Sequence, residues 1–347
     1  MVNPIDLPQT MRAVLQTNAF GDHLELATIR TPTINTAANE HLIRMHATSP
    51  CNNELRWWTY GIVLAPNKQF VPCFDLAGVV VEGPQDSPFK PGDKVFTRTN
   101  AARTGNAADY AVAVTSELAH MPNNLTFEEC ASVPLSAFTA YQALFEHGGL
   151  DGAALRTGDA TAAESNSKVK LLVTAASGGV GTWLLQLARA AGVKDIVAVC
   201  GTSNVDFVRE LGASEVIDYR KSSIQEWARQ NTKNKADLVI DCIVGTDSTT
   251  QCYHAVKANG RLNSLVKPPG DHKPTGDDAG NVAENVTPIF FIMEPRGEEL
   301  DVVRQLLEAK KCRPIVDSVF PFEDFQAAFD RVAGGHAKGK VILKVLE

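Results

Sequence analysis

A run of small residues in the middle of the chain has the composition of a phosphate-binding turn. The run consists of Ser177, Gly178, Gly179, Val180 and Gly181. An apolar, β-branched segment (169–174) precedes it, a helical pattern follows, and a second apolar segment covers 196–199. In this order of strand, glycine turn, helix and strand, backbone N–H groups and a helix N-terminus can approach a pyrophosphate. Ala175 stands where the usual motif has its first glycine, so the flanking elements carry the prediction of a dinucleotide site.

The residues that follow the second apolar segment bear on which dinucleotide binds. NAD sites usually end this strand with an acidic residue that accepts from the adenosine ribose 2′-OH. Here the strand is followed by Thr202, Ser203 and Asn204, which are small and polar, and by no carboxylate. Tyr219 ends the next strand and precedes two basic residues. We therefore expect NADPH; the alternative is that Thr202, Ser203 and Asn204 are simply a helix N-cap, a role that they could also fill while binding phosphate.

Length and composition exclude several classes of protein. The chain has 347 residues, enough for two domains, and a net charge of −7, which argues against nucleic-acid binding. No apolar run approaches the roughly 20 residues that span a bilayer, so we expect no membrane partner. The seven cysteines are scattered, with no C-x-x-C, and the N-terminus lacks a signal-peptide pattern. These features favour a reducing compartment, and we expect a cytoplasmic protein.

Two kinds of pattern alternate along the sequence. The first third contains short β patterns separated by Gly/Pro turns, and the middle alternates strand and helix patterns. We expect a doubly wound α/β domain over residues 134–287, and a β-rich domain built from 1–133 and 288–347. The polar segment 151–167 is expected to be a surface insertion, and 267–284 has the composition of a loop.

Several sequence blocks carry a resemblance to a known family. They are PCFDLAGVV (72–80), FKPGDKVF (89–96), AADYAV (107–112), SVPLSAFTAYQAL (132–144), the glycine turn, and RPIV through GHAKGKV (313–341). In this order they resemble the medium-chain dehydrogenase/reductase superfamily over nearly the whole chain. The chain is most similar to its zinc-independent quinone oxidoreductases and enoyl reductases, including fungal trans-acting enoyl reductases. The resemblance implies a Rossmann domain and a GroES-like substrate domain.

The resemblance also bears on metal binding. Zinc-dependent relatives carry Cys or His where this chain has Ser49, and His where it has Phe74. A phenyl ring coordinates nothing and a serine hydroxyl is a poor zinc ligand, so we expect no metal. Cys51 and Cys73 lie in the same blocks and are expected to be core residues. A conjugated alkene accepts hydride to give a delocalised enolate that needs only hydrogen-bond donors, so metal-free chemistry favours C=C or quinone substrates over alcohols.

The resemblance implies a substrate wall along residues 49–61. Tyr60 matches a tyrosine that faces the substrate, where its phenol could hold the carbonyl oxygen or protonate the enolate. Ser49 and Asn52 stand where the family has Asn and Asp, which leaves the proton relay open. Trp57 and Trp58 are expected to divide between lining the pocket and packing beneath it.

Further site residues are implied by the same resemblance. Thr139 matches a threonine beside the nicotinamide ribose, although it could be a helix-packing residue. The other expected cofactor contacts are Ile243, Val244, Leu265, Val266, Gly339 and Lys340. Lys340 could equally be a solvated surface lysine, and the others ordinary strand ends. Phe290 and Phe291 are expected either to close over the substrate or to pack in the sheet.

Together these inferences predict an NADPH-dependent, metal-free reductase that transfers hydride to an enone, an enoyl thioester or a quinone. One alternative is a trans-acting enoyl reductase that serves a polyketide synthase and takes a carrier-bound substrate. Another is a non-catalytic NADPH-binding scaffold. The chain could be a monomer, or a homodimer joined through the apolar segment 286–292.

Overall fold

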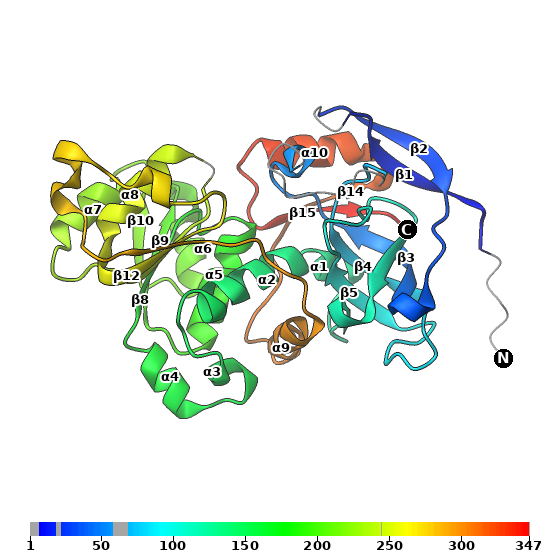
Figure 1. Cartoon of the computed structure of the whole chain (residues 1–347), viewed down its shortest axis with the longest axis horizontal. Helices are drawn as coiled ribbons and strands as arrows, with labels where there is room; N and C mark the ends of the chain where they lie inside the picture. Colours follow the sequence, from blue (N-terminus) through cyan, green and yellow to red (C-terminus); the bar gives the residue numbers. More distant parts are fainter. Residues whose placement is uncertain (1–6, 19–21, 58–68, 244, 347) are drawn as a thin grey trace. The chain divides into compact units, whose positions relative to one another are not determined.

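The computed structural model of the chain describes residues 7–18, 22–57, 69–243 and 245–346. The chain divides into two compact units (Figure 1). The terminal unit contains Met1–Phe138 and Glu294–Glu347, and the middle unit contains Thr139–Met293. The two boundaries fall five or six residues beyond the expected ones, after 138 instead of 133 and after 293 instead of 287. The second boundary is later because strand β13 (Thr287–Phe290) pairs with the sheet of the middle unit.

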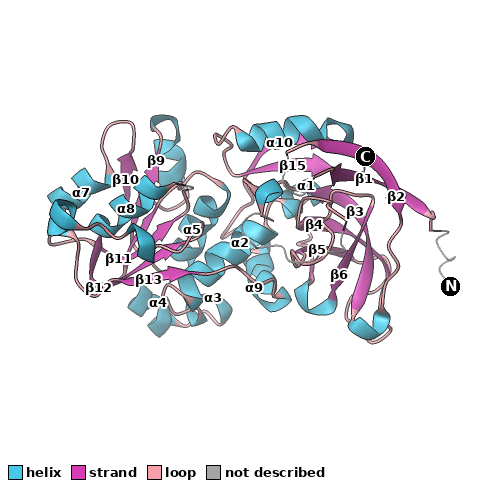
Figure 2. Ribbon diagram, turned by 45° about the horizontal axis from the view of Figure 1, so that its top comes forward, coloured by secondary structure: helices cyan, strands magenta, loops and turns pink. Residues whose placement is uncertain are grey.

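The middle unit is built on a six-stranded sheet in the order β10-β9-β8-β11-β12-β13, in which each neighbouring pair is parallel. Its other strands are β8 (Lys170–Val173), β9 (Asp195–Cys200), β10 (Glu215–Asp218), β11 (Ala236–Asp241) and β12 (Val256–Ser264). Helices α5 (Gly179–Ala190), α6 (Val205–Glu210), α7 (Ile224–Gln230) and α8 (Thr246–Ala255) alternate with these strands (Figure 2). This is the doubly wound Rossmann order, which confirms the predicted fold class.

Strands β8 and β11 lie side by side at the point where the strand order reverses. Every residue of β8 is buried, as expected for a central strand covered on both faces. In open α/β sheets, ligands bind beyond the carboxyl ends of the strands at such a switch point. Thr174 directly follows β8 and Asp241 ends β11, so both residues lie at the edge where a ligand is expected.

The expected surface insertion is helical. Residues 151–167 contain α3 (Ala153–Arg156) and α4 (Ala160–Asn166), and Asp159 caps α4 by accepting from the N–H groups of Thr161 and Ala162. The segment 267–284 contains two short 3-10 helices, Gly270–His272 and Gly276–Asn281.

The terminal unit is β-rich, as predicted. Its larger sheet has the order β14-β15-β3-β4-β5-β7, with β6 paired to β3, and β1 and β2 form a separate hairpin. The strands are β1 (Thr10–Gln16), β2 (Leu24–Arg30), β3 (Glu40–Thr48), β4 (Asp75–Glu82), β5 (Lys94–Arg98), β6 (Tyr110–Val114), β7 (Ala119–His120), β14 (Val316–Pro321) and β15 (Lys340–Lys344). Its helices are α1 (Phe127–Ala131), α9 (Gly297–Glu308) and α10 (Phe325–Ala333), and α2 (Pro134–Tyr141) crosses the boundary between the units.

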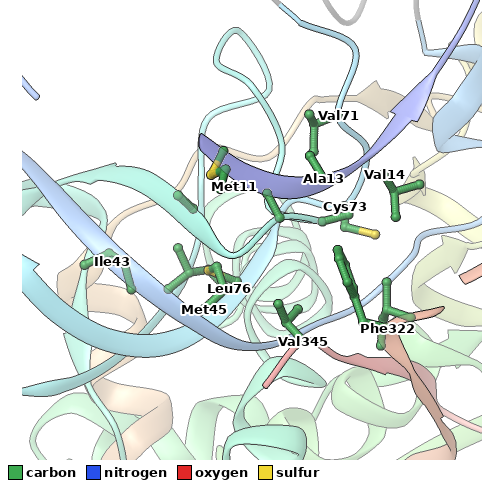
Figure 3. Close-up of a cluster of buried hydrophobic side chains, with 14 of the residues drawn as sticks. Met11, Ala13, Val14, Ile43, Met45, Val71, Cys73, Leu76, Phe322 and Val345 are labelled. Carbon is green, nitrogen blue, oxygen red and sulfur yellow. The ribbon is translucent and has the colours of Figure 1, made fainter. Parts of the chain in front are cut away.

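The core of the terminal unit joins the hairpin to the larger sheet. Met11 from β1 packs in one cluster with Ile43 and Met45 from β3 and Leu76 from β4 (Figure 3). Phe322, from the far end of the sequence, belongs to the same cluster, as do Val341 and Leu343 of β15, the strand that pairs with β3. None of the helices in the part of the chain that the structure describes combines the length and apolarity of a membrane span.

Candidate functional site

The glycine turn has the geometry of a phosphate-binding turn. Ala175 has φ +46°, in the left-handed region that favours glycine, which explains why the usual motif has glycine there. A Cβ on Gly181 would lie 2.3 Å from the carbonyl oxygen of Ala175, so only glycine fits at that position. Helix α5 begins at Gly179 and runs for 12 residues, long enough to present a positive N-terminal dipole. The turn thus offers backbone N–H groups without side chains that would obstruct a diphosphate.

The residues expected near the adenosine half come together beside this turn. Asn204 donates its amide to Ser177 Oγ over 3.1 Å. Tyr219 is 53 % exposed and its hydroxyl lies over Gly201. Ser203 is exposed in the short 3-10 helix Thr202–Asn204, just before α6. These three segments, which follow β8, β9 and β10, therefore contribute to one surface.

Sequence reasoning missed Asp218 at this end of the site. The carboxyl end of β9, at Cys200, has no carboxylate of its own, but β10 pairs with β9 in parallel and places Asp218 opposite Cys200. Thr202 donates its hydroxyl to Asp218 Oδ2 over 2.7 Å, and Lys221 Nζ lies 3.4 Å from the same oxygen. The Thr202 hydrogen bond lowers the pKa of Asp218, so this carboxyl is ionised near neutral pH.

Another set of expected residues lies at the ends of β11 and β12. The backbone N–H of Ile243 donates to Asp241 Oδ1 over 3.2 Å, and Leu265 N–H donates to the Asp241 carbonyl over 2.9 Å. Val266 follows Leu265 and is half-buried. Val244 lies outside the described residues.

The remaining expected residues of the middle unit differ in their packing. Thr139 is half-buried in α2. Phe290 is 37 % exposed at the end of β13. Phe291 packs against His147, with 4.2 Å between the ring centroids.

In the terminal unit, Lys340 is buried and engaged. It is 7 % exposed, its Nζ lies 3.2 Å from Asp75 Oδ2, and it donates to the Pro50 carbonyl over 3.2 Å. Burial opposes its charge, but the Asp75 carboxylate raises the pKa of Lys340 above its ordinary value. The alternative of a solvated surface lysine is wrong, because the ammonium is buried and bound by Asp75 and by the Pro50 carbonyl. Gly339, just before it, has φ +76°, where a Cβ would meet the Ile315 carbonyl.

The expected substrate wall is only partly described. Ser49 is buried and donates its hydroxyl to the Val341 carbonyl over 2.9 Å. Asn52 is exposed, and Trp57 stacks on Phe74 with 5.4 Å between centroids. Trp58 and Tyr60 lie outside the described residues.

Glu54 is a functional candidate that the sequence did not reveal. Its side chain is 5 % exposed, and its Oε1 accepts from the Cys73 N–H over 3.1 Å. Burial raises the pKa of Glu54 to about 7, which allows the carboxyl to exchange a proton near neutral pH. The nearest sequence signal is Cys73, which replaces a family glycine and has φ +65°.

Comparisons with known proteins agree with the fold described for the two units. The family model "Alcohol dehydrogenase GroES-like domain" matches residues 37–133, and "Zinc-binding dehydrogenase" matches residues 211–343. A solved structure, the quinone oxidoreductase from Coxiella burnetii, has a TM-score of 0.78 and 24 % identity, and covers 97 % of this chain and 100 % of that one.

Three curated relatives are similar in sequence. "Probable zinc-binding oxidoreductase, mitochondrial" from Arthroderma benhamiae is 44 % identical, covering 100 % of both chains. "NAD(P)H oxidoreductase RTN4IP1, mitochondrial" from Mus musculus is 31 % identical over 78 % of this chain and 69 % of its own. "Quinone-oxidoreductase QR1, chloroplastic" from Triphysaria versicolor is 30 % identical over 96 % of this chain and 98 % of its own.

The expectation of a cytoplasmic protein is wrong in the light of these relatives. The relative from Arthroderma benhamiae, similar over its whole length, is named as mitochondrial. The scattered free cysteines indicated only a reducing environment, and this property does not single out the cytoplasm.

The donor groups do not fit the zinc ion that these names imply. At the two ligand positions, the Ser49 hydroxyl donates to a carbonyl, and the Phe74 ring is covered by Trp57 and by the Arg98 guanidinium 5.7 Å away. Within residues 7–18, 22–57, 69–243 and 245–346, no three His, Cys, Asp or Glu side chains are grouped to hold a metal.

Proposed function

The chain belongs to the medium-chain dehydrogenase/reductase superfamily of oxidoreductases, and on that premise we propose that it reduces an activated C=C bond or a quinone with NADPH and without a metal. The observation that carries this proposal is Phe74, which stacks on Trp57 and lies beneath the Arg98 guanidinium, at a position where zinc enzymes need a ligand. An alcohol must lose a proton before or during hydride removal, and a Lewis acid assists that step. An enolate or a hydroquinone anion needs only hydrogen-bond donors.

The coenzyme part of the proposal rests on the turn after β8. Backbone N–H groups of residues 177–181 would hold the diphosphate at the N-terminus of α5. Ser203, Asn204 and Tyr219 would contact the adenosine half, with Arg220 and Lys221 adding positive charge near a 2′-phosphate. When bound, NADPH supplies the hydride.

Side chains of the protein would bind the substrate oxygen and supply the proton. Asn52 is exposed and can donate a hydrogen bond to a substrate oxygen. Ser49 is a poor candidate for the same task because its hydroxyl already donates to Val341. We assign the proton donor to Tyr60, with Thr139 beside the nicotinamide ribose. Trp57 is assigned to packing, since it stacks on Phe74, and Trp58 to lining the pocket.

A panel assay tests the proposal. Purified protein is mixed with NADPH and enones, enals, enoyl thioesters or quinones, and separately with NADP⁺ and secondary alcohols, in the presence of a chelator. We expect NADPH oxidation with a conjugated acceptor and no loss of rate with the chelator. Activity confined to alcohols and restored by Zn²⁺ would overturn the proposal.

The same panel separates the two alternatives. A trans-acting enoyl reductase would prefer carrier-bound thioesters over free enones. A non-catalytic scaffold would bind NADPH but would not oxidise it with any acceptor of the panel. The relatives' names also lead us to propose a mitochondrial location, which fractionation of the native cells tests.

A further inference from the structure

We propose that Asp241 is the positioning residue for the nicotinamide half of the coenzyme site. This inference rests on the proposed function, because it concerns the same coenzyme. Asp241 was not among the residues singled out from the sequence. Its side chain is completely buried at the carboxyl end of β11, next to β8 at the switch point of the sheet.

Four neutral donors converge on the Asp241 carboxylate. Oδ1 accepts from the Thr174 hydroxyl over 2.8 Å, from the Ser248 hydroxyl over 2.8 Å and from the Ile243 N–H over 3.2 Å. Oδ2 accepts from the Thr249 hydroxyl over 2.8 Å. A buried carboxylate is tolerated only when its oxygens are hydrogen-bonded, so these four groups are held where the carboxylate needs them.

The four donors come from three different parts of the coenzyme edge. Thr174 starts the glycine turn, and its hydroxyl also accepts from the Cys242 N–H over 2.8 Å. Ser248 and Thr249 lie in the first turn of α8, and Ile243 lies in the connection between β11 and α8. The carboxylate therefore fixes the connection after β11 to the start of the diphosphate turn.

The backbone of the same residue holds the adjacent strand end. The Asp241 carbonyl accepts from the Leu265 N–H over 2.9 Å, just after β12 ends at Ser264. Ile243 and Leu265 each belong to one of the two segments assigned to the nicotinamide half, and both are hydrogen-bonded to this one residue. Asp241 thus sets the spacing between these segments and the phosphate turn.

An amide holds these donors less firmly than the carboxylate does. In Asp241→Asn one oxygen can still accept from Thr174, Ser248 and Ile243, and the Thr249 hydroxyl must reverse and accept from the new NH₂ group. The acceptor also loses its charge, so its hydrogen bonds weaken and the connection after β11 is held less tightly. The adenosine half is held by Ser177, Asn204 and Tyr219, which make no contact with this carboxylate in the described hydrogen bonds.

The matched control lies on the same strand. Asp237 stands near the opposite end of β11, where its carboxylate accepts from the Lys170 N–H over 2.8 Å and pairs with Lys257. Asp237→Asn makes the same chemical change away from the coenzyme edge.

The experiment compares binding of whole coenzyme and of its adenosine fragment. Dissociation constants for NADPH and for adenosine 2′,5′-bisphosphate are measured for the wild type, Asp241→Asn and Asp237→Asn. We expect Asp241→Asn to weaken NADPH about tenfold, as loss of one charge-assisted hydrogen bond predicts, with the fragment within about twofold of wild type. Asp237→Asn leaves both constants unchanged.

The outcomes are distinct. Unchanged NADPH affinity in Asp241→Asn, or an equal loss for NADPH and the fragment, overturns the positioning role. Absence of NADPH binding by the wild type refutes the proposed function instead. If Asp241→Asn does not fold, Thr249→Val takes its place in the experiment, because it removes a single donor to the carboxylate. We expect the same selective loss of NADPH affinity. An equal loss of affinity for NADPH and for the fragment would again overturn the positioning role.

Discussion

Thr202 donates its hydroxyl hydrogen to the Asp218 carboxylate, with 2.7 Å between Oγ1 and Oδ2. The residue expected to bind a 2′-phosphate is therefore already paired with an anion from the neighbouring strand. Because like charges repel, the charge of this carboxylate reduces the margin by which the site prefers NADPH over NADH. Lys221, 3.4 Å from the same oxygen, offsets part of that charge.

Removing the charge of Asp218 is expected to increase the preference for NADPH. In Asp218→Asn, Thr202 is free to donate to phosphate and the repulsion is gone. The ratio of kcat/KM for NADPH to that for NADH should rise about tenfold at low ionic strength, and less at high salt. Steady-state kinetics with both coenzymes check this.

The control for Asp218 is Asp195→Asn at the opposite end of β9, where the carboxylate pairs with Lys170. It should leave the coenzyme ratio at the wild-type value. A ratio that stays constant or falls in Asp218→Asn contradicts the argument.

The regular elements of this chain were accessible from sequence because their patterns are local. The strands β6, β10 and β11 are examples, since each is a short, mostly apolar run ended by a turn or a polar residue. Strand β2 was not predicted. Its sequence, LELATIR, carries two charged residues, and its strand conformation depends on pairing with β1.

The polar contacts of the site were not accessible, because they depend on which strands are neighbours. Asp218 reaches Thr202 only because β10 pairs with β9 in a particular register, and that register is absent from any local pattern. Lys340 was expected near the coenzyme or in solvent. Pairing of β15 with β3 is part of the arrangement that buries its ammonium against Asp75.

The second prediction concerns Gly181. In Gly181→Ala, the new methyl group would lie 2.3 Å from the Ala175 carbonyl oxygen and 2.7 Å from Ala176 Cα. Both contacts are with backbone, so the start of α5 must move away from the turn. We expect NADPH affinity to fall at least about tenfold and the melting temperature to drop by several degrees, as typical for roughly 1–3 kcal/mol of overpacking.

Titration calorimetry and thermal unfolding check this prediction. The control is Gly270→Ala, where a Cβ meets nothing within 4 Å and the backbone needs no left-handed φ. Wild-type affinity in Gly181→Ala would show that the turn has room for a side chain and would remove the argument for a bare diphosphate cradle.

The third prediction concerns the ion pair of Asp75 and Lys340. Lys340→Met leaves a fully buried carboxylate without its cation, which costs roughly 3–5 kcal/mol of unfolding free energy. In Asp75→Asn with Lys340→Met, both charges are gone, and the Asn oxygen can still accept from the Leu135 N–H. The double variant should therefore be more stable than Lys340→Met alone. Urea unfolding gives the unfolding free energy of the wild type, of Lys340→Met and of the double variant. Equal stability of the single and double variants would mean that the two charges are not coupled.

The last prediction uses the titration of Glu54. Burial raises its pKa from 4.5 to about 7 in the folded protein, so between pH 4.5 and 7 the folded state binds a proton that the unfolded state has lost. The contribution of Glu54 to stability is therefore greatest below pH 4.5 and declines as pH rises to 7, by about 3 kcal/mol in all. Glu54→Gln cannot titrate, so its unfolding free energy, measured in urea across this range, should gain on the wild type by about that amount. The control is Glu164→Gln, because the Glu164 side chain is 67 % exposed, and its stability should keep the wild-type pH dependence. If the unfolding free energy of Glu54→Gln instead changes with pH in parallel with that of the wild type, the Glu54 carboxyl is in contact with water.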